Sequence, residues 1–82
     1  MPYNDKDVIM ITKKYLKELE KQYVGKRVML DEEYNYGDFA KGLIGTITEV
    51  STLGELKFEA DTGGYVYLLP EDKFHEIYNW EL

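Results

Sequence analysis

The chain has 82 residues, the length of one small domain, so we expect a single compact unit whose core is close to the marginal size. Hydrophobic residues make up 44% and charged residues 32%, which is typical of a folded globular protein, and the absence of cysteine excludes disulfides, thiolate nucleophiles and cysteine-ligated zinc or iron–sulfur sites. The net charge of −6 is split between +3 in residues 1–30 and −9 in residues 31–82, an acidic body that disfavours direct nucleic-acid binding because it repels phosphate groups.

The first predicted element is an amphipathic helix. Apolar residues recur at steps of three and four over residues 8–23, and the opposite face is rich in lysine. Thr12 is a residue type that caps helix N-termini, and Asn4 is an alternative, earlier cap. We place the helix between Thr12 and Gln22, because the β-branched residues of 8–11 also suit an extended strand. Gly25 is expected to end the helix.

Short strands separated by turns are predicted after the helix. The clearest is 55–61, where polar and apolar residues alternate strictly, as in a strand with one buried face. Turns are expected at 52–54 and 61–64, and one helical turn at 70–73. The five predicted strands span residues 27–30, 45–50, 55–61, 65–69 and 74–78. Their short, closely spaced arrangement favours a small antiparallel barrel over a parallel sheet.

Several motifs carry a resemblance to a known family. They are QYVGKRV (22–28), GKRVML (25–30), KGLIGTI (41–47), GELKF (54–58), DTGG (61–64) and LLPEDKF (68–74). In this order they resemble a small SH3-like family of domains of unknown function from Gram-positive bacteria, their phages and conjugative elements, over about residues 12–78. The chain departs from the family in lacking a tryptophan near Phe58 and a proline-rich loop before the second strand.

The resemblance implies a fold but no chemistry. We expect one mainly β domain, in which residues 1–24 form an N-terminal amphipathic helix packed on residues 25–82, an SH3-like five-stranded antiparallel barrel. The family has no established activity to carry over. The resemblance therefore implies a mobile-element origin and nothing catalytic.

Few residues offer catalytic or cofactor chemistry. Ser51 is the only serine and His75 the only histidine, so a hydrolytic triad lacks its parts, and one histidine without cysteine cannot hold zinc. The acidic cluster at 31–38 lacks the spacing of a calcium loop, and the glycines do not form a phosphate-binding loop. We therefore expect no enzyme, no metal and no cofactor.

The strongest functional signal is a group of aromatic residues beside acidic ones. Such rings rarely all fit inside a small barrel, although about half of them could simply cover its core. A tyrosine-rich loop flanked by carboxylates suits recognition of a basic protein surface. The predicted partner-binding residues are Asp31, Glu32, Glu33, Tyr34, Tyr36, Asp38, Phe39, Tyr65 and Tyr67, with Tyr78 and Trp80 as neighbours.

These observations predict a non-catalytic binding module. From the family's setting we expect a small acidic accessory or counter-defence protein, such as an anti-CRISPR, that binds and masks a basic host protein, for example a CRISPR or restriction effector. One alternative is an oligomeric sponge that grips a phosphorylated signalling nucleotide with Lys26, Arg27 and Lys41, and another is a nucleic-acid-binding SH3-like barrel. The acidity could also serve solubility alone.

Assembly and location are predicted from the same features. The apolar stripe of the helix either packs on the barrel or pairs with a second copy, so we expect a monomer or a homodimer through the N-terminal helix. No apolar run approaches the roughly 20 residues of a membrane-spanning helix, and the first residues lack a basic segment leading into an apolar one. We expect a cytoplasmic protein, in the host cytoplasm if a phage encodes it, with no membrane partner.

Overall fold

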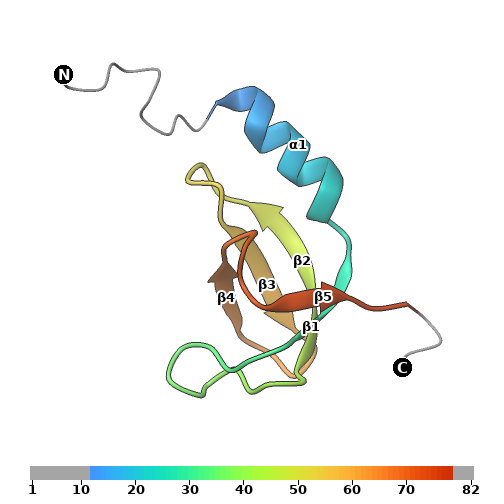
Figure 1. The fold of residues 1–82 in the computed structure, drawn as a ribbon, viewed down its shortest axis with the longest axis vertical. Coiled ribbons are helices and arrows are strands. Elements are labelled where there is room, and N and C mark those ends of the chain that lie inside the picture. The colour runs from blue at the N-terminus through green and yellow to red at the C-terminus, as the bar shows by residue number, and fades with distance from the viewer. Residues whose placement is uncertain (1–11, 79–82) are drawn as a thin grey trace.

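The computed structural model describes residues 12–78, which form one α-helix and five antiparallel β-strands (Figure 1). The elements are α1 (Lys13–Tyr23), β1 (Arg27–Leu30), β2 (Ile44–Val50), β3 (Leu56–Ala60), β4 (Tyr65–Leu68) and β5 (Phe74–Glu76). Neighbouring strands pair in the order β4-β3-β2-β1-β5, which confirms the predicted mainly β fold with one helix. Among the described residues the sheet is not closed into a barrel, because β4 and β5 form its two edges and do not pair with each other.

The ends of α1 are set by local chemistry at Thr12 and Gly25. The Thr12 hydroxyl accepts a hydrogen bond from the Tyr15 N–H at 3.1 Å, so Thr12 is the N-cap that the sequence predicted. The chain leaves the helix through Val24 (φ −64°, ψ 130°) and Gly25 (φ 89°), the geometry of a type II turn that favours glycine. The Gly25 N–H then donates to the Ile47 carbonyl at 2.8 Å, which attaches the helix end to β2.

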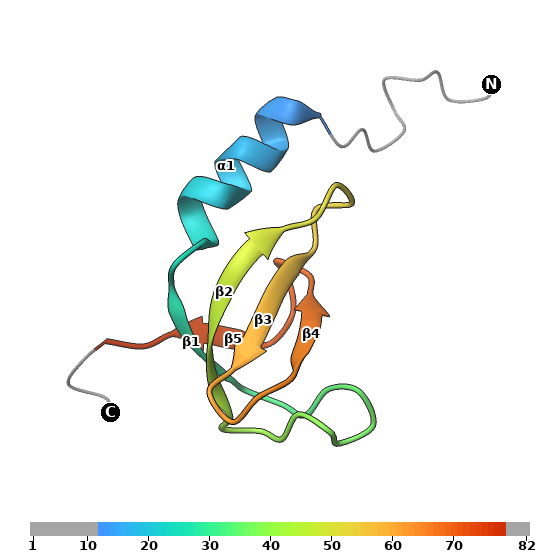
Figure 2. The ribbon, with the colours of Figure 1, turned by 180° about the vertical axis from the view of Figure 1, so that it is seen from behind.

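Only part of the apolar stripe of α1 is used for packing on the sheet. Leu19 is buried and Tyr23 is half buried, whereas Tyr15, one helical turn before Leu19, remains 41% exposed. Figures 1 and 2 show that the C-terminal end of α1 is the part of the helix that meets the sheet. The sequence also predicted that residues 8–11 contribute to this stripe, and these residues lie outside the described part of the chain. Within residues 12–78, no helix has the length and apolarity needed to cross a membrane.

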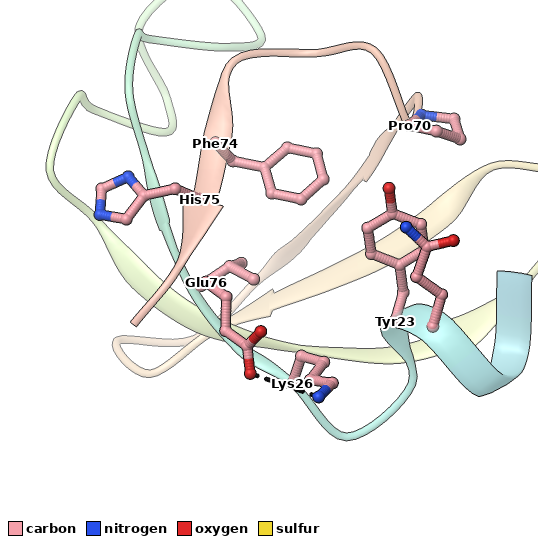
Figure 3. Close-up of a pocket in the computed structure, with 8 residues that line it drawn as sticks. Tyr23, Lys26, Pro70, Phe74, His75 and Glu76 are labelled. Carbon is pink, nitrogen blue, oxygen red and sulfur yellow. Dashed lines mark ion pairs between the residues drawn. The ribbon is translucent and has the colours of Figure 1, made fainter. Parts of the chain in front are cut away.

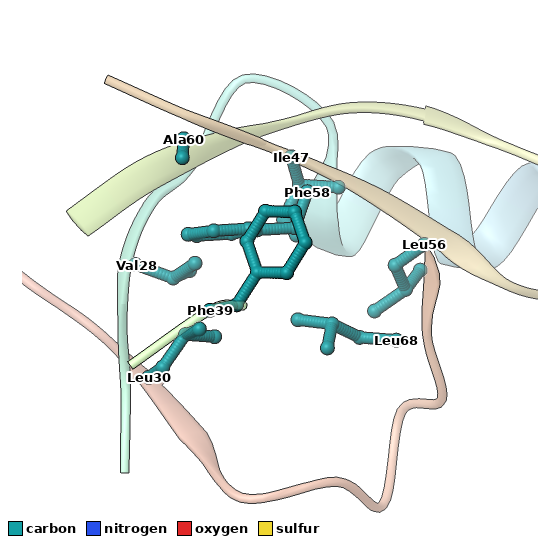
Figure 4. Close-up of a cluster of buried hydrophobic side chains, with 8 residues drawn as sticks. All are labelled: Val28, Leu30, Phe39, Ile47, Leu56, Phe58, Ala60 and Leu68. Carbon is teal, nitrogen blue, oxygen red and sulfur yellow. The ribbon is translucent and has the colours of Figure 1, made fainter. Parts of the chain in front are cut away.

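Alternate side chains of the strands point into one hydrophobic core (Figure 4). On β3, Leu56, Phe58 and Ala60 are buried, and Lys57 and Glu59 between them face outward. The core cluster consists of Val28, Leu30, Phe39, Ile47, Leu56, Phe58, Ala60 and Leu68. One member, Phe39, comes from the loop between β1 and β2 and not from a strand, so the core also holds that loop in place.

The connection between β4 and β5 differs from the predicted helical turn. The Asp72 N–H donates to the Leu69 carbonyl at 2.9 Å, and the Asp72 carboxylate accepts from the Leu69 N–H at 2.7 Å. These two bonds close one β-turn around Pro70, and residues 70–73 contain no helix. The helical prediction was wrong because a short polar side chain that bonds back to the backbone favours a turn over a helix.

Candidate binding surface

The loop between β1 and β2 ends in a small hairpin. The Tyr34 N–H donates to the Phe39 carbonyl at 2.8 Å, and the Phe39 N–H donates back to the Tyr34 carbonyl at 3.1 Å. Residues 35–38 form the tip, where the Asn35 amide donates to the Asp38 carboxylate at 3.0 Å. The tip is therefore held in shape by its own hydrogen bonds.

Tyr36 lies at this tip with its side chain fully in solvent. Its exposed fraction is 103%, so the ring contacts nothing else in residues 12–78. Its backbone is left-handed (φ 57°), as are those of its neighbours Asn35 (φ 54°) and Gly37 (φ 90°). Asparagine and glycine suit that conformation, but tyrosine does not. Within residues 12–78, no contact of the ring compensates for this disfavoured backbone.

Tyr34 and Phe39 face the opposite way and anchor the hairpin. The ring of Phe39 belongs to the core, and Tyr34 is half buried. The Tyr34 hydroxyl accepts from the Lys73 N–H at 2.6 Å and donates to the Lys73 carbonyl at 3.2 Å. Burial raises the pKa of this hydroxyl, and the negative charges of Asp72 and Glu32 add to the rise. We therefore leave both rings out of the exposed contact surface.

The acidic residues of the loop differ in their bonding. Asp31 lies 2.9 Å from Nδ1 of His75 on β5, an ion pair when the imidazole is protonated. Glu32, Glu33 and Asp38 are exposed and form no ion pair within residues 12–78. These three carboxylates thus carry negative charge that no described base neutralises, and two of them lie at the tip: Asp38 bonds to Asn35, and a side chain at Gly37 would lie 3.7 Å from the Glu33 carboxylate.

Tyr65 and Tyr67 form a second aromatic group, on β4. Their rings meet edge to face with centroids 5.9 Å apart, and they are 56% and 41% exposed. The ammonium of Lys57, which the sequence analysis did not single out, lies 4.5 Å from the centroid of the Tyr65 ring. A side chain at Gly64 would lie 3.6 Å from the ring of Phe39, so β4 begins beside the anchor of the hairpin.

The remaining predicted neighbours do not join this surface within the described residues. Tyr78 is exposed just after β5, at the opposite edge of the sheet from β4. Trp80 lies outside the described residues. The structure therefore brings together the hairpin and the start of β4, through the contact of Phe39 with Gly64.

A cavity of about 200 Å³ between the end of α1 and β5 was missed by the sequence analysis (Figure 3). Tyr23 and Phe74 form its apolar wall, with ring centroids 6.1 Å apart, and Pro70 lies beside them. Lys26 and Glu76 form an ion pair of 3.4 Å at its rim. The lining comes from three separate segments of the chain, so no local motif marks it.

Side chains suited to catalysis are not brought together. The Ser51 hydroxyl accepts from the N–H groups of Leu53 (3.2 Å) and Glu55 (3.1 Å) and so stabilises the turn between β2 and β3. His75 lies on β5 and is paired with Asp31. Within residues 12–78, no three histidine, aspartate or glutamate side chains are placed to hold a metal ion.

Two of the three bases predicted to grip a nucleotide are already paired with carboxylates. Arg27 donates two hydrogen bonds of 2.6 Å to Asp61, and Lys26 pairs with Glu76. The Arg27–Asp61 hydrogen bond raises the pKa of the guanidinium and lowers that of the carboxyl group. A phosphate would have to displace these partners.

Comparisons of the chain with protein-family models, with curated proteins and with solved structures found no match. The SH3-like resemblance of the sequence therefore has no relative to support it and stays a prediction. The function has to be argued from the geometry of the surface itself.

Proposed function

We propose that the protein is a non-catalytic binding module, and that the hairpin at residues 34–39 presents Tyr36 to a basic surface of a protein partner. The observation that carries this proposal is the full exposure of Tyr36 on a left-handed backbone. Tyrosine offers a large rigid contact area, and Glu32, Glu33 and Asp38 supply charge that attracts a basic surface.

The counter-defence role predicted from the family resemblance is a special form of this proposal. In that form the partner is a host CRISPR or restriction effector whose basic channel normally holds nucleic acid. An acidic hairpin with an exposed ring would compete with phosphate groups for such a channel. Within the same proposal we assign the fold to the SH3-like class in an open form, with β4 and β5 unpaired, supported by its five short antiparallel strands.

The nucleotide-sponge alternative is less favoured because Lys26 and Arg27 are paired with Glu76 and Asp61. Direct nucleic-acid binding by the hairpin is disfavoured by its uncompensated carboxylates. A protein partner with a basic surface is the class that fits both the ring and the charge.

The test is affinity capture from a lysate of a Gram-positive host, with bound proteins identified by mass spectrometry. Three immobilised proteins are compared: the wild type, Tyr36→Gly, and Leu53→Ala, which removes another largely exposed apolar side chain (70% exposed) from a different turn. We expect a basic protein that is captured by the wild type and by Leu53→Ala but lost with Tyr36→Gly. Capture that is equal for all three proteins, or no specific capture, would contradict the proposal.

A further inference from the structure

The outer edge of β4 carries backbone groups without partners. The Ala60 N–H donates to the Gly64 carbonyl at 3.0 Å, which sets the phase of the β3–β4 ladder. Because bonding alternates along an antiparallel strand, Val66 and Leu68 direct their N–H and C=O groups to β3, and Tyr65 and Tyr67 direct theirs outward. No residue of 12–78 bonds to these outward groups.

The next outward position along the chain is already closed. Both backbone groups of Leu69 bond to Asp72, the N–H through the carboxylate at 2.7 Å and the carbonyl through the Asp72 N–H at 2.9 Å. The open row is thus limited to Tyr65 and Tyr67. Figures 1 and 2 both place β4 at the side of the sheet, with β3 as its one neighbouring strand.

This edge lacks several of the devices that normally prevent strand addition, although β4 is only four residues long. β4 has the sequence Tyr65-Val66-Tyr67-Leu68, without proline or charge, and its register with β3 is continuous, without a bulge. The other edge is protected by polar side chains, because β5 carries His75 and Glu76. An unprotected edge in a protein that otherwise protects its edges is consistent with a use for that edge.

The side chains around the open edge combine an aromatic pair with a net negative charge. The Lys57 ammonium already lies 4.5 Å from the centroid of the Tyr65 ring, which shows that a cation fits against this aromatic pair. Glu59, in register with Tyr65, is paired with Lys57 at 3.9 Å and accepts from the Thr48 hydroxyl at 2.7 Å, and the Asp72 carboxylate accepts from the Leu69 N–H. Glu71, exposed after the strand, forms no ion pair within residues 12–78, so three carboxylates against Lys57 leave this edge net negative.

We propose that the β4 edge takes an extended basic segment of a protein partner, which adds to the sheet as an antiparallel sixth strand. Residues directly opposite each other in an antiparallel pair place their side chains on the same face. Lysine or arginine residues opposite Tyr65 and Tyr67 therefore stack on the two rings. Their backbone groups bond to the outward N–H and C=O groups of Tyr65 and Tyr67. The inference rests on the proposed function only for the basic character of the partner; the hairpin tip takes no part in it.

The probe for this edge is a short synthetic peptide of alternating threonine and lysine, added to the full chain. Binding is followed by NMR, with hydrogen exchange of the backbone amides as the site-specific readout. We expect the Tyr65 and Tyr67 amides to gain protection, because peptide carbonyls cover them, while the Val66 and Leu68 amides, already bonded to β3, change little.

Two N-methylated peptides distinguish strand addition from charge attraction. Methyl groups on the lysine amides remove the donors that face β4, whereas methyl groups on the threonine amides alter the opposite edge and leave the charge the same. Each lost backbone hydrogen bond weakens binding several-fold, so we expect the lysine-methylated peptide to bind about tenfold more weakly or worse. Equal binding of the two methylated peptides, unchanged exchange at Tyr65 and Tyr67, or no binding of the parent peptide at millimolar concentration would each overturn the inference.

Matched variants of the protein complete the test. Tyr67→Ala removes a ring and keeps the outward N–H, and Tyr67→Pro removes the N–H as well, at a position where it serves no ladder bond. We expect weaker peptide binding with Tyr67→Pro than with Tyr67→Ala. Circular dichroism checks that both variants are folded. Tyr36→Gly should bind the peptide like the wild type. If the peptide does not bind at β4 while affinity capture still finds a partner that requires Tyr36, this inference is rejected and the proposed function stands.

Discussion

At the scale of single residues, Tyr36 combines a disfavoured backbone with a ring that contacts nothing else in residues 12–78. A left-handed conformation costs an ordinary L-residue about 1–2 kcal/mol, and Tyr36 has φ 57°. Asn35 and Gly37 lower the strain of the same turn, because asparagine and glycine tolerate this region. Glycine at position 36 would suit the hairpin better, so the ring is unexplained by stability.

We predict that Tyr36→Gly stabilises the protein, by about 0.5–1 kcal/mol in the free energy of unfolding. Glycine relieves the left-handed strain, and the larger entropy of its unfolded chain offsets part of the gain. The measurement is urea denaturation of the wild type, Tyr36→Gly and Tyr36→Ala. Alanine removes the ring but keeps the strain, so a glycine variant no more stable than the alanine variant would show that the backbone is relaxed at this position.

The sequence predicted the aromatic loop but could not sort its rings. Tyr34, Tyr36 and Phe39 all lie in one loop, where no strand or helix period distinguishes an inward from an outward position. The outcome depends on the Tyr34–Phe39 bridge and on bonds from Tyr34 to Lys73, which is 39 positions away. Such non-local bonds leave no local pattern, so Tyr36 alone retains the predicted role of an exposed ring in this loop.

At the scale of elements, one side-chain pair connects β1 to the turn after β3. Arg27 on β1 binds both carboxylate oxygens of Asp61 at 2.6 Å and also lies 3.2 Å from the Thr46 hydroxyl on β2. The hydrogen bond between Arg27 and Asp61 lowers the pKa of the Asp61 carboxyl group. The pair thus spans three neighbouring strands and depends on the ionised form of the carboxyl group.

We predict that the coupling between Arg27 and Asp61 disappears in acid. The folded-state pKa of Asp61 lies below the unfolded value of about 3.9, so its contribution is complete above that pH and is lost as the pH falls through the folded value. A double-mutant cycle of Arg27→Gln and Asp61→Asn, measured by urea denaturation between neutral and acid pH, should give a favourable coupling energy at pH 7 that is lost as the pH falls through the folded-state pKa of Asp61. A coupling energy that does not change with pH would contradict the ionic account.

Elements specified by local rules were predicted well, and those specified by distant contacts were not. The start of α1 at Thr12 and the span of β1 follow from a capping residue and a short β-rich run. The turn around Pro70 is an exception, because it depends on the local bond between Asp72 and Leu69 and was still predicted as a helical turn. The open edge at β4 depends on the order in which the strands pair. The cavity beside Phe74 needs three segments to meet.

At the scale of the whole molecule, charge of opposite sign lies at opposite ends. The bases of α1 outnumber its acids, with Lys13, Lys14, Lys17 and Lys21 against Glu18 and Glu20. The loop at 31–39 contains four acids and no lysine or arginine. Figures 1 and 2 show α1 at one end of the sheet and this loop at the other. A basic surface therefore attracts one end of the protein and repels the other, which orients the molecule before contact.

We predict that the position of the negative charge, and not its total, sets the rate of binding to a basic surface. Glu33→Lys with Asp38→Lys, and Glu18→Lys with Glu20→Lys, both change the net charge from −6 to −2, the first pair on the loop and the second on α1. On a polylysine-coated biosensor at low salt, the loop pair should slow the initial association by about tenfold, while the helix pair changes it much less. The difference should vanish near 1 M salt, where screening shortens the Debye length to about 3 Å. Equal slowing by the two pairs would show that net charge alone governs association and that the hairpin end has no orienting role.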